Sequence, residues 1–245
     1  MTDAGKMWTA WAAALAACLV SAVSLIWASG APLAFGVRLW AEQVLIAALG
    51  LSMALVFLGR SWRGAERPPE AAPWPDRLLA LGAAAYGGFL VWRFPHLSEN
   101  LFYAREEALW VASIGLALLL ETVRRALSWP LILILGAVCG YALFADRFPG
   151  ALLSRAVSPE RLVSFTILDS ASMAGAALSI AVIVVVPYVV LARLLAQSGG
   201  SAFFSDLAVA LLGRTRGGSG KIAILASALF GSISGSAVAN VASTG

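Results

Sequence analysis

Seven apolar runs constrain the fold of this 245-residue chain more than any other feature of its sequence. A helix rises about 1.5 Å per residue, so about 20 apolar residues cross the roughly 30 Å hydrocarbon core of a bilayer. Runs of this length predict membrane-spanning helices, and the sequence predicts an all-α integral membrane protein, a multi-span helical bundle. The runs are Trp8 to Ser29, Leu39 to Leu58, Arg77 to Phe94, Glu107 to Val123, Trp129 to Phe144, Ala174 to Leu195 and Lys221 to Ala239.

The composition argues against an ordinary soluble domain. Hydrophobic residues make up 60% of the chain and charged residues 12%, against about half and a quarter in soluble proteins. The formal net charge of +4 would suggest nucleic acid in a soluble protein, but here the basic residues stand between the apolar runs. We therefore expect the lipid bilayer as a partner, and no nucleic acid. Cys18 and Cys139 lie inside apolar runs without metal-ligand spacing, so we expect buried small side chains and neither a disulfide nor a metal site.

The distribution of basic residues predicts a cytoplasmic N-terminus. With that orientation, eleven of the 17 Lys and Arg residues fall on the cytoplasmic side and six on the other, as the positive-inside rule requires. The connection from Gly59 to Pro75, with four prolines and three arginines, is interpreted as a semi-rigid cytoplasmic linker. The connection from Arg147 to Ser172 is placed outside and is expected to carry an interfacial helix. The eleven are Lys6, Arg60, Arg63, Arg67, Arg77, Arg124, Arg125, Arg193, Arg214, Arg216 and Lys221.

The last fifteen residues, 231 to 245, replace bulky side chains with glycine, serine and other small residues inside a run of membrane depth. Backbone that leaves the helix at that depth is tolerated only against protein or water, and broken helices of this kind bind ions and substrates in transporters. We therefore predict a re-entrant helical hairpin over residues 221 to 245, with oxygen donors for sodium. Close helix packing through small residues fits the same composition equally well. The candidate donors are Ser232, Ser234, Ser236, Asn240, Ser243 and Thr244, and Gly231, Gly235 and Gly245 would allow unusual backbone angles.

Two sequence patterns that suggest an enzyme do not hold. The stretch ending in Lys221 resembles a phosphate-binding loop, but the opening glycine is missing and Ile222 replaces the Ser or Thr that would contact magnesium. Ser234 could suggest an intramembrane serine protease, but the only histidine, His96, sits in a loop on the outside, so the nucleophile has no base at membrane depth. We expect no catalytic residues, and the protease stays a remote alternative.

Several stretches resemble the membrane component of tripartite ATP-independent periplasmic (TRAP) transporters, specifically the fused permease of the TAXI branch. They are Arg193 to Lys221 and Phe230 to Asn240, with upstream support from Glu121 to Pro130, Tyr141 to Phe144 and Ser158 to Ser164. The resemblance implies an elevator-type secondary transporter in the bacterial inner membrane. It would be driven by sodium, with no other cofactor, and would take small carboxylates from a TAXI-type periplasmic binding protein.

The resemblance also implies a division of the chain and a set of site residues. Residues 1–105 would form small-subunit-like helices, and residues 106–245 the N-terminal part of the large transport subunit, so that the chain is expected to be an N-terminal fragment. In the non-fused branch an Asp often stands where this chain has Asn240, so the resemblance supports no charge-based role there. The rival hypothesis is a membrane scaffold or assembly subunit that transports nothing. The implied sodium and substrate contacts are Ser232, Ser234, Gly235, Ser236, Asn240 and Thr244, with sodium at Ser234, Gly235 and Ser236.

Overall fold

The computed structural model describes residues 3–36, 39–99, 105–127, 129–213 and 217–234. Within these ranges all regular elements are helices, which confirms the predicted all-α fold. The chain forms two compact units, Met1–Val182 and Ile183–Gly245, and each is described by itself.

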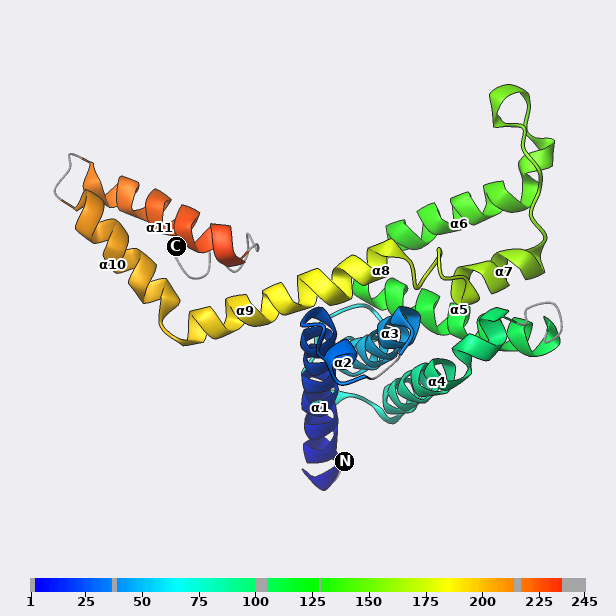
Figure 1. Cartoon of the computed structure of the whole chain (residues 1–245), viewed down its shortest axis with the longest axis horizontal. Coiled ribbons are helices and arrows are strands. Elements are labelled where there is room, and N and C mark those ends of the chain that lie inside the picture. The colour runs from blue at the N-terminus through cyan, green and yellow to red at the C-terminus, as the bar shows by residue number, and fades with distance from the viewer. Residues whose placement is uncertain (1–2, 37–38, 100–104, 128, 214–216, 235–245) are drawn as a thin grey trace. The chain divides into compact units, whose positions relative to one another are not determined.

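The first unit contains eight α-helices and three short 3-10 turns in its described residues (Figure 1). The α-helices are α1 (Asp3–Ala28), α2 (Ala31–Ala34), α3 (Ala41–Gly59), α4 (Trp74–Glu99), α5 (Arg105–Leu127), α6 (Trp129–Phe144), α7 (Pro159–Leu168) and α8 (Ala176–Ile180). The 3-10 turns are η1 (Pro69–Ala71), η2 (Ala145–Arg147) and η3 (Gly150–Leu152). The second unit holds α9 (Val186–Gln197), α10 (Gly200–Leu212) and α11 (Gly218–Ser234).

Five helical stretches among the described residues are long and apolar enough to cross a membrane, so the chain is a multi-pass membrane protein. They are Met7–Ala28, Ala41–Gly59, Trp74–Glu99, Trp129–Arg147 and Ala176–Gln197, and each overlaps an expected span. The expected span from Glu107 to Val123 falls on α5. The 23 residues of α5 measure about 34 Å, but they carry more charge than the five stretches above. The seventh expected span falls on α11, which has a shorter apolar stretch, Gly218–Leu229.

The core of the first unit lies where α3, α4 and α5 meet. Gly50 of α3 and Gly87 of α4 are both buried, and a Cβ added at Gly87 would stand 2.9 Å from the Cα of Gly50. Small residues therefore let these two helices approach almost backbone to backbone. On the other side of α4, the Tyr86 hydroxyl lies over Gly115 of α5 and donates a hydrogen bond to the Val111 carbonyl at 3.0 Å. Gly50 and Gly87 thus let α3 and α4 approach closely, and Tyr86 links α4 to α5.

The structure confirms a helix in the connection from Arg147 to Ser172, and one end of this helix packs against protein. Pro159 stands at the start of α7, and the Ser158 hydroxyl caps that start by accepting from the Arg161 amide. Ile167 and Leu168, at the other end, are fully buried in a cluster that includes Ala112 of α5. This end of α7 is therefore held by protein, and its place at the membrane interface stays a prediction.

The prediction that Cys18 and Cys139 are buried was wrong, because both side chains are exposed. Cys139 lies on α6, which has no buried residue at all. Lipid tails are as apolar as the side chains themselves, so an apolar residue in a span gains little by turning toward protein. Sequence position inside an apolar run therefore did not decide burial.

The apolar stretch Ala176–Gln197 is helical throughout but irregular in its middle. A π-helical segment, Ala181–Val185, joins α8 to α9 immediately before Pro187. Proline has no amide hydrogen to donate to the preceding turn, and a widened turn is a common way for a helix to accommodate that loss.

Candidate functional site

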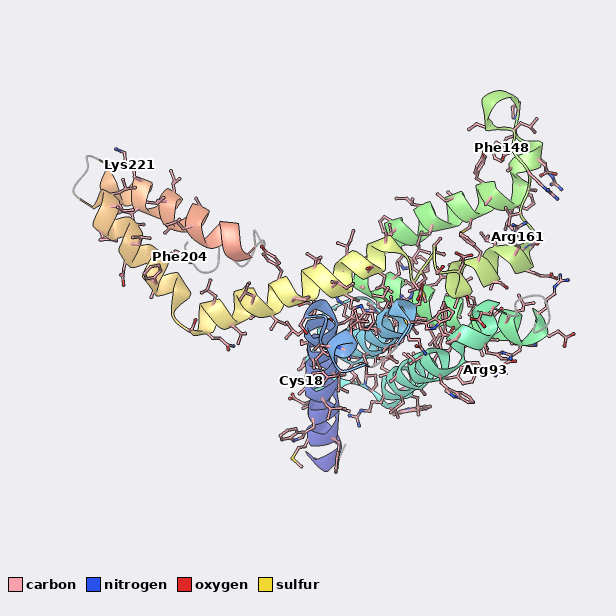
Figure 2. The ribbon with its side chains drawn as sticks, viewed as in Figure 1. Cys18, Arg93, Phe148, Arg161, Phe204 and Lys221 are labelled. Carbon is pink, nitrogen blue, oxygen red and sulfur yellow. The ribbon has the colours of Figure 1, made fainter. Side chains whose placement is uncertain are left out.

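The structure of the second unit centres on two helices that lead to the serine-rich tail. α10 and α11 pack against each other, and both contact α9 (Figure 1). Phe204 lies in the first half of α10, and Lys221 lies in the first turn of α11 (Figure 2). α10 covers the stretch from Phe203 to Leu212, in which Asp206 is the only charged residue.

Two adjacent glycines make the turn from α9 into α10. Gly199 has a φ of 89°, a left-handed conformation that side chains rarely adopt. A Cβ on Gly200 would stand 2.7 Å from the Leu195 carbonyl oxygen, so no larger residue fits there without a shift of the backbone. The Ser198 hydroxyl donates to that same carbonyl at 3.0 Å and closes the end of α9. The sequence Ser198-Gly199-Gly200 therefore specifies a tight turn between the two helices.

Small residues also lie in the contact between these helices. Ala208 of α10 and Ala226 of α11 are buried, whereas Phe203 and Ile224 are exposed. Buried alanines with large apolar side chains outside are the arrangement by which helices pack closely in a membrane. Ala208 and Ala226 therefore support the hypothesis that small residues serve helix packing here. Both residues come before the serine-rich tail.

The structure reaches only the beginning of the predicted ion site. Ser232 and Ser234 lie in the last turn of α11, while Gly235, Ser236, Asn240 and Thr244 lie outside the described residues. Their contacts with sodium or substrate, and the predicted re-entrant turn, therefore stay predictions. Among the described residues, no three His, Cys, Asp or Glu side chains gather in a way that could hold a metal ion.

The helix geometry nevertheless gives the distance from Lys221 at which the motif begins. α11 is continuous from Lys221 to Ser234, which places Ser234 about 20 Å along the helix axis from the lysine. Lysine prefers the membrane interface, and the hydrocarbon core is about 30 Å thick. A helix that enters a bilayer at Lys221 would therefore carry the backbone of Ser234 into the hydrocarbon core.

A second polar region, missed from the sequence, lies between α5 and α7 in the first unit. It is an open cavity of about 510 Å³ whose polar lining comes from Arg105, Ser158, Glu160, Arg161, Ser164 and Asp169. Arg105 forms an ion pair with Glu160, and Arg161 projects from α7 (Figure 2). Two arginines and two acidic residues line it, so their formal charges balance. It comes from two stretches that are far apart in the chain, and no local motif marks it.

Comparison with known protein families decides the identity of the second half of the chain. The family model for the DctM component of the tripartite ATP-independent periplasmic transporter matches residues 114–245, which is more than half of the chain. The chain belongs to the DctM family. No curated protein and no solved structure matches it.

The DctM match begins inside α5 and runs through α6 to α11 and the serine-rich tail. It confirms the resemblance to TRAP transporters: this chain is a membrane permease component of that transporter class. A DctM component is part of a transporter rather than an enzyme, and the family implies a periplasmic binding protein as its partner. Residues 1–113 lie outside the DctM match.

Proposed function

We propose that this DctM-family permease couples the uptake of small organic acids to a sodium gradient, with the coupling ion held by the motif that begins at Ser232. The observation that carries the proposal is the length of continuous helix that precedes that motif. α11 delivers Ser234 about 20 Å along its axis from Lys221, where only hydroxyl, amide and carbonyl oxygens of the protein can replace the hydration shell of an ion.

The chemistry of the tail supports sodium rather than a transition metal. Sodium prefers oxygen ligands, and the implied contacts offer hydroxyls together with the carbonyls freed where a helix unwinds. The proposed sodium ligands come from Ser234, Gly235 and Ser236, and Asn240 and Thr244 complete the proposed substrate contacts. Asn240 carries no charge, so in this proposal the substrate carboxylate is held by backbone dipoles and neutral donors.

The transport cycle is proposed to be of the elevator type, in the bacterial inner membrane, with a TAXI-type binding protein delivering the substrate. The resemblance of Arg193 to Lys221 and Phe230 to Asn240 to the TAXI branch supports the choice of partner. The excess of basic residues on one side supports a cytoplasmic N-terminus.

The proposal is tested by sodium-dependent uptake into proteoliposomes, with the intact permease and its binding protein. Ser234→Leu and Ser236→Leu each remove one oxygen donor and add bulk. Loss of one contact to a charged group corresponds to about 1.5–3 kcal/mol, so the sodium concentration for half-maximal uptake should rise at least about tenfold. Ser219→Leu, an exposed position in the first turn of the same helix, is the matched control and should leave sodium dependence unchanged.

The same assay distinguishes the transporter from the rival scaffold subunit. The buried Ala208 and Ala226 are the observation that favours the rival, because they show small residues packing helices together. A scaffold subunit would give no sodium-driven uptake with any binding protein. If the wild-type protein transports and both leucine variants keep its sodium dependence, the motif is a packing element and the ion site lies elsewhere.

A further inference from the structure

Helices α4 and α5 run antiparallel and are joined by ion pairs at both ends. Near one end, Arg93 Nε lies 2.9 Å from Glu107 Oε1. Near the other, Arg125 Nη1 lies 2.8 Å from Asp76 Oδ1. Asp76 and Arg93 are about 26 Å apart along α4, close to the thickness of the hydrocarbon core. The charges of α5 are thus gathered at the two ends of a membrane-sized interval.

The two ion pairs differ in burial. The side chains of Arg93 and Glu107 are 29% and 40% exposed, whereas those of Arg125 and Asp76 are 3% and 7% exposed. An exposed pair contributes little, because water screens the charges and the side chains lose freedom. A buried pair is weak evidence for net stability, but removal of one partner leaves a charge without compensation and is strongly destabilising.

The buried pair is part of a larger group of charges, which we call the joint cluster: Arg67, Asp76, Glu121, Arg124 and Arg125. Asp76 Oδ2 accepts from Arg67 at 2.5 Å, so two guanidinium groups share its carboxylate. Arg125 uses a second donor, Nε, to reach Glu121 at 2.6 Å. Glu121 in turn accepts two bonds of 2.7 Å from Arg124. Every charge in the joint cluster therefore has an opposite charge within hydrogen-bond distance.

The proline-rich connection between α3 and α4 forms hydrogen bonds with the C-terminal end of α5, next to the joint cluster. Arg60 Nη1 donates to the Ala126 carbonyl at 3.1 Å, where the end of α5 leaves carbonyls without helical partners. In the opposite direction, Arg124 donates to the Trp62 carbonyl at 2.8 Å, and its guanidinium stacks 4.8 Å from the Trp62 ring centre. The connection is more than a semi-rigid spacer, because side chains and backbone carbonyls of the connection and of the end of α5 form hydrogen bonds with each other.

These contacts cross the beginning of the DctM match. Arg67 and Asp76 precede residue 114, whereas Glu121, Arg124 and Arg125 follow it. We propose that the joint cluster is the interaction surface by which the helices before residue 114 hold the DctM-matched region, with Asp76 and Arg125 as its central positioning pair. The N-terminal helices are then a partner of the permease within the same chain. This proposal does not depend on sodium coupling or on the identity of the substrate.

The test cuts the folded protein between the two partners. A protease site is inserted between Glu99 and Arg105 of the full chain, the protein is purified in detergent and cleaved, and a dilution series gives the dissociation constant of the two pieces. Asp76→Asn and Arg125→Met should each weaken their association at least about 100-fold, because each removes the ion pair of the joint cluster that links the two pieces and leaves the other, buried side chain with one charged partner in place of two. The double variant should bind more tightly than the product of the two single effects predicts.

Arg125→Lys is the milder variant for which folding is most secure. Lysine keeps the charge but lacks the forked donors of the guanidinium, in which Nη1 contacts Asp76 and Nε contacts Glu121, so its effect should fall between the wild-type protein and Arg125→Met. Arg93→Met and Glu107→Gln, on the same helices at the opposite end, are the matched controls and should change the association no more than about fivefold.

Two results would overturn the proposal. In the first, Arg125→Lys and Arg125→Met behave like the two control variants, so that burial of the charges has no consequence for association. In the second, the effects of Asp76→Asn and Arg125→Met simply multiply in the double variant, which would show that the two side chains act independently. Sodium-dependent uptake is not needed for either reading.

Discussion

The close crossing of α3 and α4 offers a sharp test of how this membrane protein is held together. Gly87 and Gly88 are neighbours on α4, but Gly87 is buried against Gly50 whereas Gly88 is exposed with nothing within 4 Å of an added Cβ. Replacing each glycine with alanine adds the same methyl group to the same helix. Both substitutions therefore gain a similar helix propensity of about 0.8–1 kcal/mol, and any difference between them measures the contact.

The size of that difference follows from the distances. A Cβ at position 87 would lie 2.9 Å from the Gly50 Cα, whereas carbon atoms in contact prefer about 3.5–4.0 Å. The helices would have to move apart by roughly 0.6–1.1 Å at the crossing, because both contacting atoms belong to backbone. Overpacking of this kind costs about 1–3 kcal/mol. Gly87→Ala should therefore be less stable than Gly88→Ala by about 1–3 kcal/mol.

Thermal unfolding in detergent, followed by intrinsic tryptophan fluorescence, measures this difference. For a chain of this size 1 kcal/mol corresponds to about 2–4 °C, so the midpoint for Gly87→Ala should lie roughly 2–12 °C below that for Gly88→Ala. Gly50→Ala, which approaches the same contact from the other helix at 2.8 Å, should behave like Gly87→Ala. Equal midpoints for the two α4 variants would refute the argument that the glycine pair sets the approach of these helices.

Two further predictions concern α5 and the topology of the chain. Gly115→Ala would place a Cβ 2.7 Å from the Tyr86 ring carbon Cζ and displace the hydroxyl from the Val111 carbonyl, so its midpoint should fall by roughly 2–12 °C, whereas Gly136→Ala in exposed α6 should not lower it. In a background with Cys18→Ser and Cys139→Ser, Arg63→Cys should react with an impermeant thiol reagent only from the cytoplasmic side and Arg147→Cys only from the periplasmic side. The reverse pattern would overturn the predicted cytoplasmic N-terminus.

Sequence alone located the five helical stretches that are long and apolar enough to cross a membrane, because such a helix is defined by local composition and length. It did not predict which helices touch or through which residues. Asp76 and Arg125 are separated by 49 positions, and only the antiparallel packing of α4 and α5 brings them together. Gly87 and Gly88 are equivalent in any sequence pattern, although one is buried and the other exposed. For the candidate site, the oxygen-bearing residues of the tail indicate a chemistry, but their composition serves helix packing and ion binding alike.

The contrast between α3 and α6 gives the physical reason for this limit. Both are strongly apolar, with mean hydropathies of 2.0 and 1.7 over their spans, yet half of the α3 window is buried and only 6% of the α6 window. In water such similar helices would both be forced into a core, but lipid solvates an apolar side chain as well as protein does. Burial in this chain must then come from close approach and from polar contacts. Those are the features of α3, α4 and α5, through Gly50, Gly87 and the joint cluster, and α6 has neither a glycine in contact nor a buried charge.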